Sequence, residues 1–148
     1  GTRDLRQTHW FKTSWGTSYL LKHNADLEYA KEKVRMITLA EMYYIAAECL
    51  LRKNDPKAAD YFNAVLESRG LVALDDRIPA ESLTIEKITQ ERYKEFVGEG
   101  QTFFNMKRLN LDIQAITGEI LPAANSIYTV PVPEEEFNYR NEVYDVKQ

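Results

Sequence analysis

The chain has 148 residues, of which 44% are hydrophobic and 28% charged, a balance typical of a globular protein with a core of its own. Its formal net charge is −4 and no run is rich in lysine or arginine, which argues against nucleic acid as a partner and against a basic membrane-surface patch. No apolar run approaches the roughly 18 residues of a membrane span, and the opening residues 1–4 lack the apolar segment of a signal peptide, so localisation cannot be read from them.

The first predicted element is a short strand or hairpin. Residues 9–21 are rich in aromatic and threonine side chains, which favour extended backbone. Residues 24–26, with the sequence Asn-Ala-Asp, are then predicted to form a turn. The chain is therefore expected to begin with β structure before its helices.

The first predicted helix runs from Met36 to about Lys53. Its apolar residues recur at helical spacing and form one stripe, which consists of Leu39, Met42, Tyr43, Ala46, Cys49 and Leu50. Cys49 is the only cysteine, so it cannot form an intrachain disulfide, and neither His9 nor His23 has the signature of a catalytic partner. We therefore expect Cys49 to be a small core residue.

A second helix is predicted after a tight turn. Asp55 is a good N-cap, Pro56 suits a first helical position, and Gly70 can end the helix in a left-handed conformation. One face carries Ala59, Phe62, Val65 and Leu66. The two helices are similar to a single tetratricopeptide hairpin, and a lone repeat of this kind needs neighbours to bury its apolar face.

Residues 70–83 are predicted to form a loop, and Thr84 is predicted to cap a third helix. The register of that helix is set by Ile85, Ile88, Arg92, Phe96 and Val97. Gly98 and Gly100 are expected to end it.

A fourth helix is predicted from Thr102 to about Asn110. The tail 111–148 is expected to be irregular, with a strand-like run at 127–130 and a single turn at 134–137.

The residues best suited to catalysis form a charged cluster, which consists of Glu91, Arg92, Glu95, Glu99 and Arg108. Glu95 and Glu99 would be the carboxylate pair of a glycosidase, which needs two carboxyls roughly 5–10 Å apart, one of them protonated. Carboxyls beside an arginine favour the ionised form. We therefore expect a partly buried ion-pair network that ties the third and fourth helices together and sets geometry more than it adds stability.

Three aromatic residues near the N-terminus, Trp10, Trp15 and Tyr19, lie among polar residues. Flat rings next to hydrogen-bonding groups suit a sugar, because a pyranose presents apolar C–H patches and a polar rim. The alternative is that these rings pack in the core or against other parts of the protein. They are the candidate ligand-binding residues.

Metal and cofactor motifs are missing. The sequence has no HExxH, no CxxC, no EF-hand loop and no glycine-rich phosphate loop after a strand. The pair Asp75–Asp76 alone is typical of a solvated loop. No metal and no cofactor are expected.

Several segments taken together resemble one known family. The longest are LAEMYYIAAE at 39–48, NAVLESRG at 63–70, QERYKEFVGEG at 90–100 and YTVPVPEEE at 128–136. Shorter ones are DLR at 4–6, YLLKH at 19–23 and NMKR at 105–108. Each is weak alone, but in this order and over nearly the whole chain they are similar to the C-terminal region of SusD/RagB-family proteins.

The resemblance implies a mainly α fold with a tetratricopeptide-like helical hairpin, further helices, irregular loops and the short N-terminal strand or hairpin. It also implies a non-catalytic lipoprotein on the surface of a Bacteroidota-type outer membrane, held by an N-terminal lipid anchor that is absent from this chain. Such a protein would capture oligosaccharide, or peptide, for a SusC-like TonB-dependent transporter. No nucleic acid partner is expected.

We expect residues 1–148 to form a single domain that resembles the C-terminal part of such a protein. Since members of the family are usually several times longer, the chain would be a cut segment or a reduced member. Two alternatives remain open at this point: a helical-repeat scaffold that binds a protein, and a glycosidase that uses Glu95 and Glu99.

Overall fold

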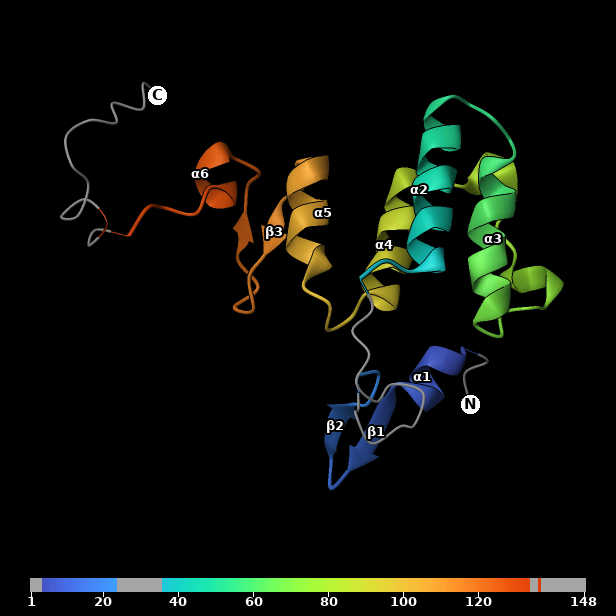
Figure 1. Ribbon diagram of the computed structural model, residues 1–148, viewed down its shortest axis with the longest axis horizontal. Coiled ribbons are helices and arrows are strands. Elements are labelled where there is room, and N and C mark those ends of the chain that lie inside the picture. Colours follow the sequence, from blue (N-terminus) through green and yellow to red (C-terminus); the bar gives the residue numbers. More distant parts are fainter. Residues whose placement is uncertain (1–3, 24–35, 134–135, 137–148) are drawn as a thin grey trace. The chain divides into compact units, whose positions relative to one another are not determined.

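The computed structural model describes residues 4–23, 36–133 and 136, and it is mainly α-helical, as the sequence predicts (Figure 1). Contacts between Cα atoms divide the chain into two compact units, Gly1–Thr102 and Phe103–Gln148. The single domain expected from the sequence stays a prediction.

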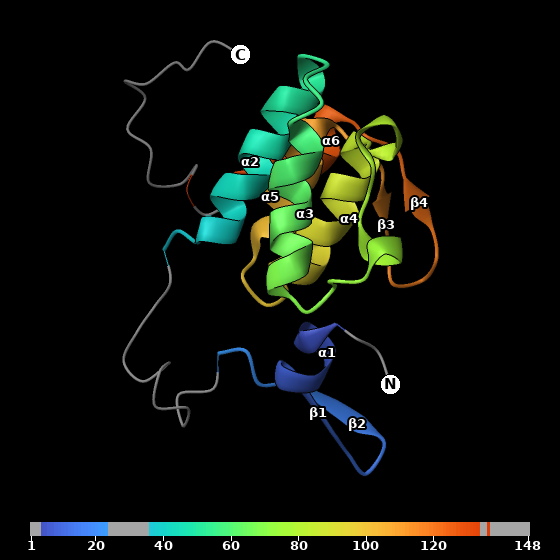
Figure 2. The ribbon, with the colours of Figure 1, turned by 90° about the vertical axis from the view of Figure 1, so that its right-hand side faces the viewer.

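The first unit consists of a short helix, a β-hairpin and three longer helices. These elements are α1 (Leu5–His9), β1 (Phe11–Ser14), β2 (Thr17–Leu20), α2 (Leu39–Arg52), α3 (Ala58–Ser68) and α4 (Ile85–Glu95). α2 contacts both α3 and α4, and the three helices lie side by side (Figure 2). The predicted N-terminal hairpin and the predicted helical pair are both confirmed, whereas the predicted turn at 24–26 lies outside the described residues.

The two helices of the pair begin differently, since only α2 has a side-chain cap. The Thr38 hydroxyl accepts the backbone N–H of Glu41 at 3.2 Å, so α2 begins slightly later than its apolar period suggests. The Asp55 carboxylate accepts the N–H of Lys57 at 2.9 Å, and the regular α3 helix begins at Ala58. The N-cap position of α3 is Lys57, which makes no side-chain cap hydrogen bond, so the prediction that Asp55 is the N-cap is wrong and its carboxylate instead holds the turn before the helix.

The core lies where the three helices meet. Its largest fully buried side chains are Tyr44, Phe62 and Ile88, and the Tyr44 ring centroid lies 6.1 Å from that of Phe62 and 6.2 Å from that of Phe96. Burying one such side chain contributes about 1.5–3 kcal/mol. Within the described part of the chain the Tyr44 hydroxyl has no hydrogen-bond partner, and burial, followed by the charges of nearby carboxylates, raises its pKa.

The buried face of α2 differs from the predicted stripe by about one position. The buried residues are Ala40, Tyr44, Ala47 and Glu48. Leu39 and Met42 are exposed, and so is Cys49, so the prediction that Cys49 belongs to the core is wrong. The cause is that α2 carries apolar residues around most of its circumference, so that spacing alone does not fix which side faces the neighbouring helices.

The connection from α3 to α4 is more regular than the predicted loop. It contains two short 3₁₀ turns, at Leu74–Asp76 and Ala80–Ser82. The Asn63 side chain donates to the Ile78 carbonyl and accepts the Ile78 N–H, both at 2.8 Å, and thereby holds the connection on α3. The Thr84 hydroxyl then caps α4, as predicted.

The hairpin of β1 and β2 is antiparallel and pairs Phe11 with Leu20. Its two turn residues, Trp15 and Gly16, have φ angles of 51° and 76°, as a type I′ turn requires at both central positions. Glycine adopts such angles freely, whereas a left-handed residue with a side chain costs roughly 1–2 kcal/mol. The turn is therefore strained at Trp15.

The hairpin rests on the turn that follows α4. Gly98 has a φ of +78°, and a Cβ atom placed there would lie 2.6 Å from Cδ2 of Leu20. Only glycine fits this contact without a shift. α4 ends at Glu95, three residues before Gly98, so the helix is shorter than the sequence predicts.

The second unit holds α5 (Gln101–Leu109), which crosses the boundary between the units, and a small pair of strands with a short helix. These are β3 (Ile113–Gln114), β4 (Ile120–Leu121) and α6 (Asn125–Tyr128). The prediction of a strand-like run at 127–130 is wrong, because Tyr128 lies in α6. The Tyr128 hydroxyl donates to the Leu111 carbonyl, and the Tyr128 carbonyl accepts from Lys107 Nζ at 2.8 Å. These contacts override the β propensity of the segment. Apart from residue 136, the turn predicted at 134–137 lies outside the described residues.

Candidate functional site

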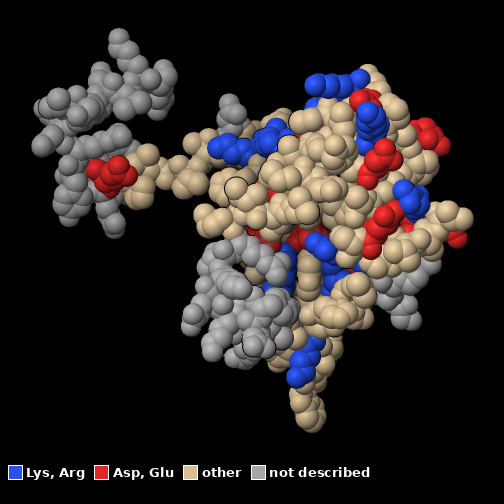
Figure 3. Space-filling model, turned by 45° about the vertical axis from the view of Figure 1, so that its right-hand side comes forward, with Lys and Arg blue, Asp and Glu red and all other residues tan. Residues whose placement is uncertain are grey.

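Three carboxylates lie along one side of the chain that forms α4 and the turn after it. Glu91 and Glu95 are four residues apart on α4, which places them on one helical face, and Glu99 follows in the turn after the helix. Glu91 and Glu95 are buried, and Glu99 is partly buried. Basic and acidic side chains gather where the helices meet the hairpin (Figure 3).

Arg6, from α1, is the central cation of this cluster and is only 4% exposed. Its guanidinium donates to Asp4 at 2.7 Å and to Glu91 at 2.8 Å, and it approaches Glu95 at 3.5 Å. Burial alone would lower the pKa of Arg6, but the hydrogen bonds to Asp4 and Glu91 outweigh it and raise that pKa. For Asp4, burial acts in the opposite sense, and the contact with Arg6 holds its pKa below the usual value.

Arg69, which directly follows α3, is the second arginine that binds Glu95. Its Nε and Nη2 atoms donate to the two carboxylate oxygens at 2.9 and 2.5 Å, a bidentate geometry. The hydrogen bonds to Glu95 raise the pKa of Arg69 against the effect of burial. Both oxygens of Glu95 are therefore occupied by arginines, and no room is left there for a substrate.

Lys22, which follows β2, binds the C-terminal end of α4. Its ammonium donates to the Glu99 carboxylate at 2.6 Å and to the backbone carbonyl of Glu95. A cation at a helix C-terminus is favoured by the helix dipole. The same ammonium lies 4.3 Å from the centroid of the Trp10 ring and 6.0 Å from that of Phe96. Trp10 is therefore packed over the cluster.

The remaining predicted members lie elsewhere. Arg92 approaches Glu41 of α2 at 4.0 Å and lies 5.1 Å from the Phe96 ring. Arg108 belongs to the second unit, where it donates to Asn105 at 2.7 Å. Sequence reasoning found the carboxylates but missed their cations, Arg6, Lys22 and Arg69, although all three stand in segments that carry the family resemblance.

The cluster therefore joins the N-terminal segment to the helices. Arg6 precedes the hairpin, Lys22 follows it, and both cations are held by carboxylates of the α4 segment. An ion-pair network of this kind fixes geometry, because desolvation offsets much of the attraction between its charges. Its effect is to hold the two ends of the hairpin in place.

The hairpin itself is exposed on both faces. Trp15 at its turn has 101% of its reference exposure, and Tyr19 on β2 has 52%. Strand register places Lys12 opposite Tyr19 and Ser14 opposite Thr17. Because cross-strand partners point to the same side of a hairpin, these four residues share one face, which we call the polar hairpin face.

The structure thus separates the three predicted aromatic residues. Trp10 is half-buried over Lys22, and the ring also lies 5.7 Å from the guanidinium carbon of Arg69. Trp15 and Tyr19 project into solvent at the turn and on the polar hairpin face. Of the three predicted aromatic residues, Trp15 and Tyr19 are therefore the ones open to a ligand.

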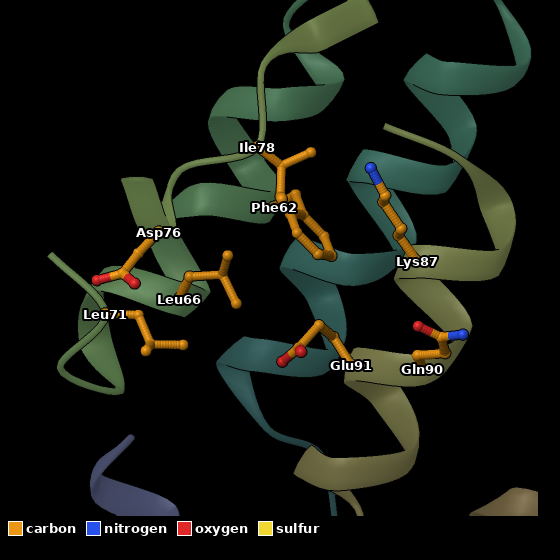
Figure 4. Close-up of a pocket in the computed structure, with 8 residues that line it drawn as sticks. All are labelled: Phe62, Leu66, Leu71, Asp76, Ile78, Lys87, Gln90 and Glu91. Carbon is orange, nitrogen blue, oxygen red and sulfur yellow. The ribbon is translucent and has the colours of Figure 1, made fainter. Parts of the chain in front are cut away.

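A pocket of about 240 Å³ lies between α3, the α3–α4 connection and α4 (Figure 4). Its floor is apolar, with Phe62, Leu66 and Ile78, and its rim carries Lys87 and Glu91. The pocket is smaller than the ~300 Å³ from which ligand sites usually start, and Glu91 is already bound to Arg6. The exposed hairpin is therefore the better candidate for a ligand surface.

Two further observations concern the described residues as a whole. None of their helices is both long and apolar enough to cross a membrane. Nor do their His, Cys, Asp and Glu side chains form a group of three or more that could hold a metal ion.

The sequence model of the SusD family matches residues 6–146, which is nearly the whole chain. No curated protein and no solved structure matches the chain significantly.

Proposed function

Because the chain belongs to the SusD family of glycan-binding components of nutrient uptake, we propose that it captures oligosaccharides and delivers them to a SusC-like TonB-dependent transporter in the outer membrane. Its role is binding and transfer without chemistry. The ligand surface that we assign within this chain is the hairpin, with Trp15 and Tyr19 as its stacking residues.

The strained and exposed Trp15 carries the assignment to the hairpin. A type I′ turn favours asparagine, aspartate or glycine at this position, yet the turn holds a tryptophan with a φ of 51° and full exposure. Backbone strain of this kind is concentrated at binding sites. A ligand that covers the indole would compensate for both the strain and the exposed apolar area.

The chemistry of the hairpin fits a carbohydrate. An indole and a phenol present flat apolar faces to the C–H patches of a pyranose. The hydroxyl groups of Ser14 and Thr17, which share the polar hairpin face with Tyr19, are available for the sugar hydroxyls. The ion-pair cluster supports this surface by fixing both ends of the hairpin.

The geometry gives no support to a glycosidase. Glu95 is 4% exposed and bound by two arginines, and Glu99 is bound by Lys22. A glycosidase needs both carboxyls beside the scissile bond, with room for the sugar.

A protein-binding scaffold is the second candidate function, and the outer side of α2 favours it. Leu39 and Met42 are exposed there, and so is Ile45. Exposed apolar residues grouped on one helix are a common feature of protein interfaces. Recovery of a large β-barrel transporter from native outer membranes would support our proposal, whereas recovery of a soluble protein alone would support the scaffold.

Calorimetric titration with neutral oligosaccharides of glucose, xylose and mannose tests the proposed ligand surface. We expect Trp15→Ala to weaken binding roughly fivefold to tenfold, since a lost aromatic stacking contact costs about 1–1.4 kcal/mol. Tyr93→Ala is the matched control, because Tyr93 is 64% exposed and belongs to α4 instead of the hairpin. Unchanged affinity in Trp15→Ala, with a lower melting temperature, would make Trp15 a packing residue and contradict the assignment.

A further inference from the structure

The charge of the N-terminal segment differs from that of the rest of the chain. Residues 5–23 contain Arg6, Lys12 and Lys22 but no aspartate or glutamate, although the whole chain carries a net charge of −4. A basic segment in an acidic protein is the electrostatic arrangement that attracts an anion to one place.

Two of the three cations are already neutralised. Arg6 is bound by Asp4 and Glu91, and Lys22 is bound by Glu99. Lys12 differs from both: it lies on β1, its side chain is exposed, and it makes no ion pair or hydrogen bond with any residue that the structure describes. Figure 3 agrees, since the projecting hairpin shows a basic group and no acidic one.

The position of Lys12 relates its charge to the aromatic rings. Lys12 is the cross-strand partner of Tyr19, so both side chains lie on the polar hairpin face. Trp15 stands at the turn three residues further along. A ring that stacks on Tyr19 or Trp15 would bring its substituents within reach of the lysine.

We propose that the polar hairpin face selects acidic sugars, with Lys12 binding the carboxylate of a uronic acid or the sulfate of a sulfated sugar. This inference rests on the proposed function, because it names the ligand class of the same surface. An ammonium recognises both groups as oxygen anions. The rings and the hydroxyls of Ser14 and Thr17 bind the sugar itself, while Lys12 distinguishes acidic from neutral units.

Paired ligands that differ only in charge provide the test. One pair is an oligogalacturonate and its neutral methyl ester, and the other is a sulfated galactan oligosaccharide and its desulfated form. The protein is the full chain, together with Lys12→Gln and the control Lys57→Gln, which removes an exposed lysine on the turn between α2 and α3. Thermal melting checks that both variants remain folded.

We expect the wild-type chain to bind the acidic member of at least one pair about threefold more tightly, as befits one exposed ion pair. That preference should weaken with added salt and vanish in Lys12→Gln, while Lys57→Gln retains it. The pair that shows the preference identifies the anion as carboxylate or sulfate.

Equal affinity for acidic and neutral members, or a preference that survives in Lys12→Gln, would overturn the inference and leave glycan capture intact. Failure to bind any of the four ligands or any neutral oligosaccharide would overturn both the inference and the proposed function.

Discussion

Replacing Glu95 by glutamine tests the role of the ion-pair cluster. The substitution keeps the size of the side chain and removes the charge that faces Arg6 and Arg69. Glu95 is 4% exposed, so the arginines lose a partner that water cannot easily replace. The prediction is a substantial loss of stability.

The magnitude follows from what remains around each arginine. Removing one partner of a buried ion pair costs about 3–5 kcal/mol when the other is left uncompensated. Arg6 keeps Asp4 and Glu91, and the Arg69 side chain is 26% exposed, so water compensates it in part. We therefore expect a loss of about 2–3 kcal/mol in the free energy of unfolding.

Urea denaturation of Glu95→Gln and of a matched control provides the assay. The control is Glu67→Gln, whose carboxylate also lies 2.5 Å from an arginine, Arg77, but whose side chain is 41% exposed. An exposed pair contributes about 0–1 kcal/mol. If Glu95→Gln costs no more than Glu67→Gln, the cluster does not anchor the hairpin in the way that we infer.

Two further substitutions probe the attachment of the N-terminal segment. Because Arg6 holds the pKa of Asp4 below its ordinary value, Asp4 contributes stability above about pH 4, and this contribution is lost as the pH falls through the folded-state pKa. Asp4→Asn should therefore be less stable at pH 7 and lose less on acidification; identical pH profiles in urea denaturation would contradict this. Gly98→Ala should destabilise the chain by more than Gly100→Ala, because both glycines have positive φ but only Gly98 would place its Cβ against Leu20. Each change costs roughly 1–2 kcal/mol from the left-handed backbone, so equal melting temperatures for the two variants would show that Leu20 does not rest there.

Local signals in the sequence predict the helices and their ends well. The hydroxyl of Thr84 caps α4 as expected, and Gly70 ends the α3 region with a φ of +85°. Such features depend on neighbouring residues alone, which is why pattern and propensity find them. The short β3–β4 pair was not predicted, because two residues per strand are too few for an alternating pattern.

Long-range contacts could not be predicted in the same way. Arg6 reaches Glu91 across 85 positions and Lys22 reaches Glu99 across 77, and no local pattern encodes such pairs. Trp10 and Trp15 have similar neighbours in the sequence, yet the Trp10 ring packs against Lys22 and the Trp15 ring is fully exposed at a turn. Only the folded arrangement distinguishes a packing ring from a ring open to a ligand.

Tryptophan fluorescence during glycan titration tests the central claim most directly, because the chain has two tryptophans, Trp10 and Trp15. We predict that a bound oligosaccharide changes the emission of the wild-type chain and of Trp10→Phe but leaves that of Trp15→Phe unchanged. A response that persists in Trp15→Phe and disappears in Trp10→Phe would contradict glycan capture at the tip of the hairpin.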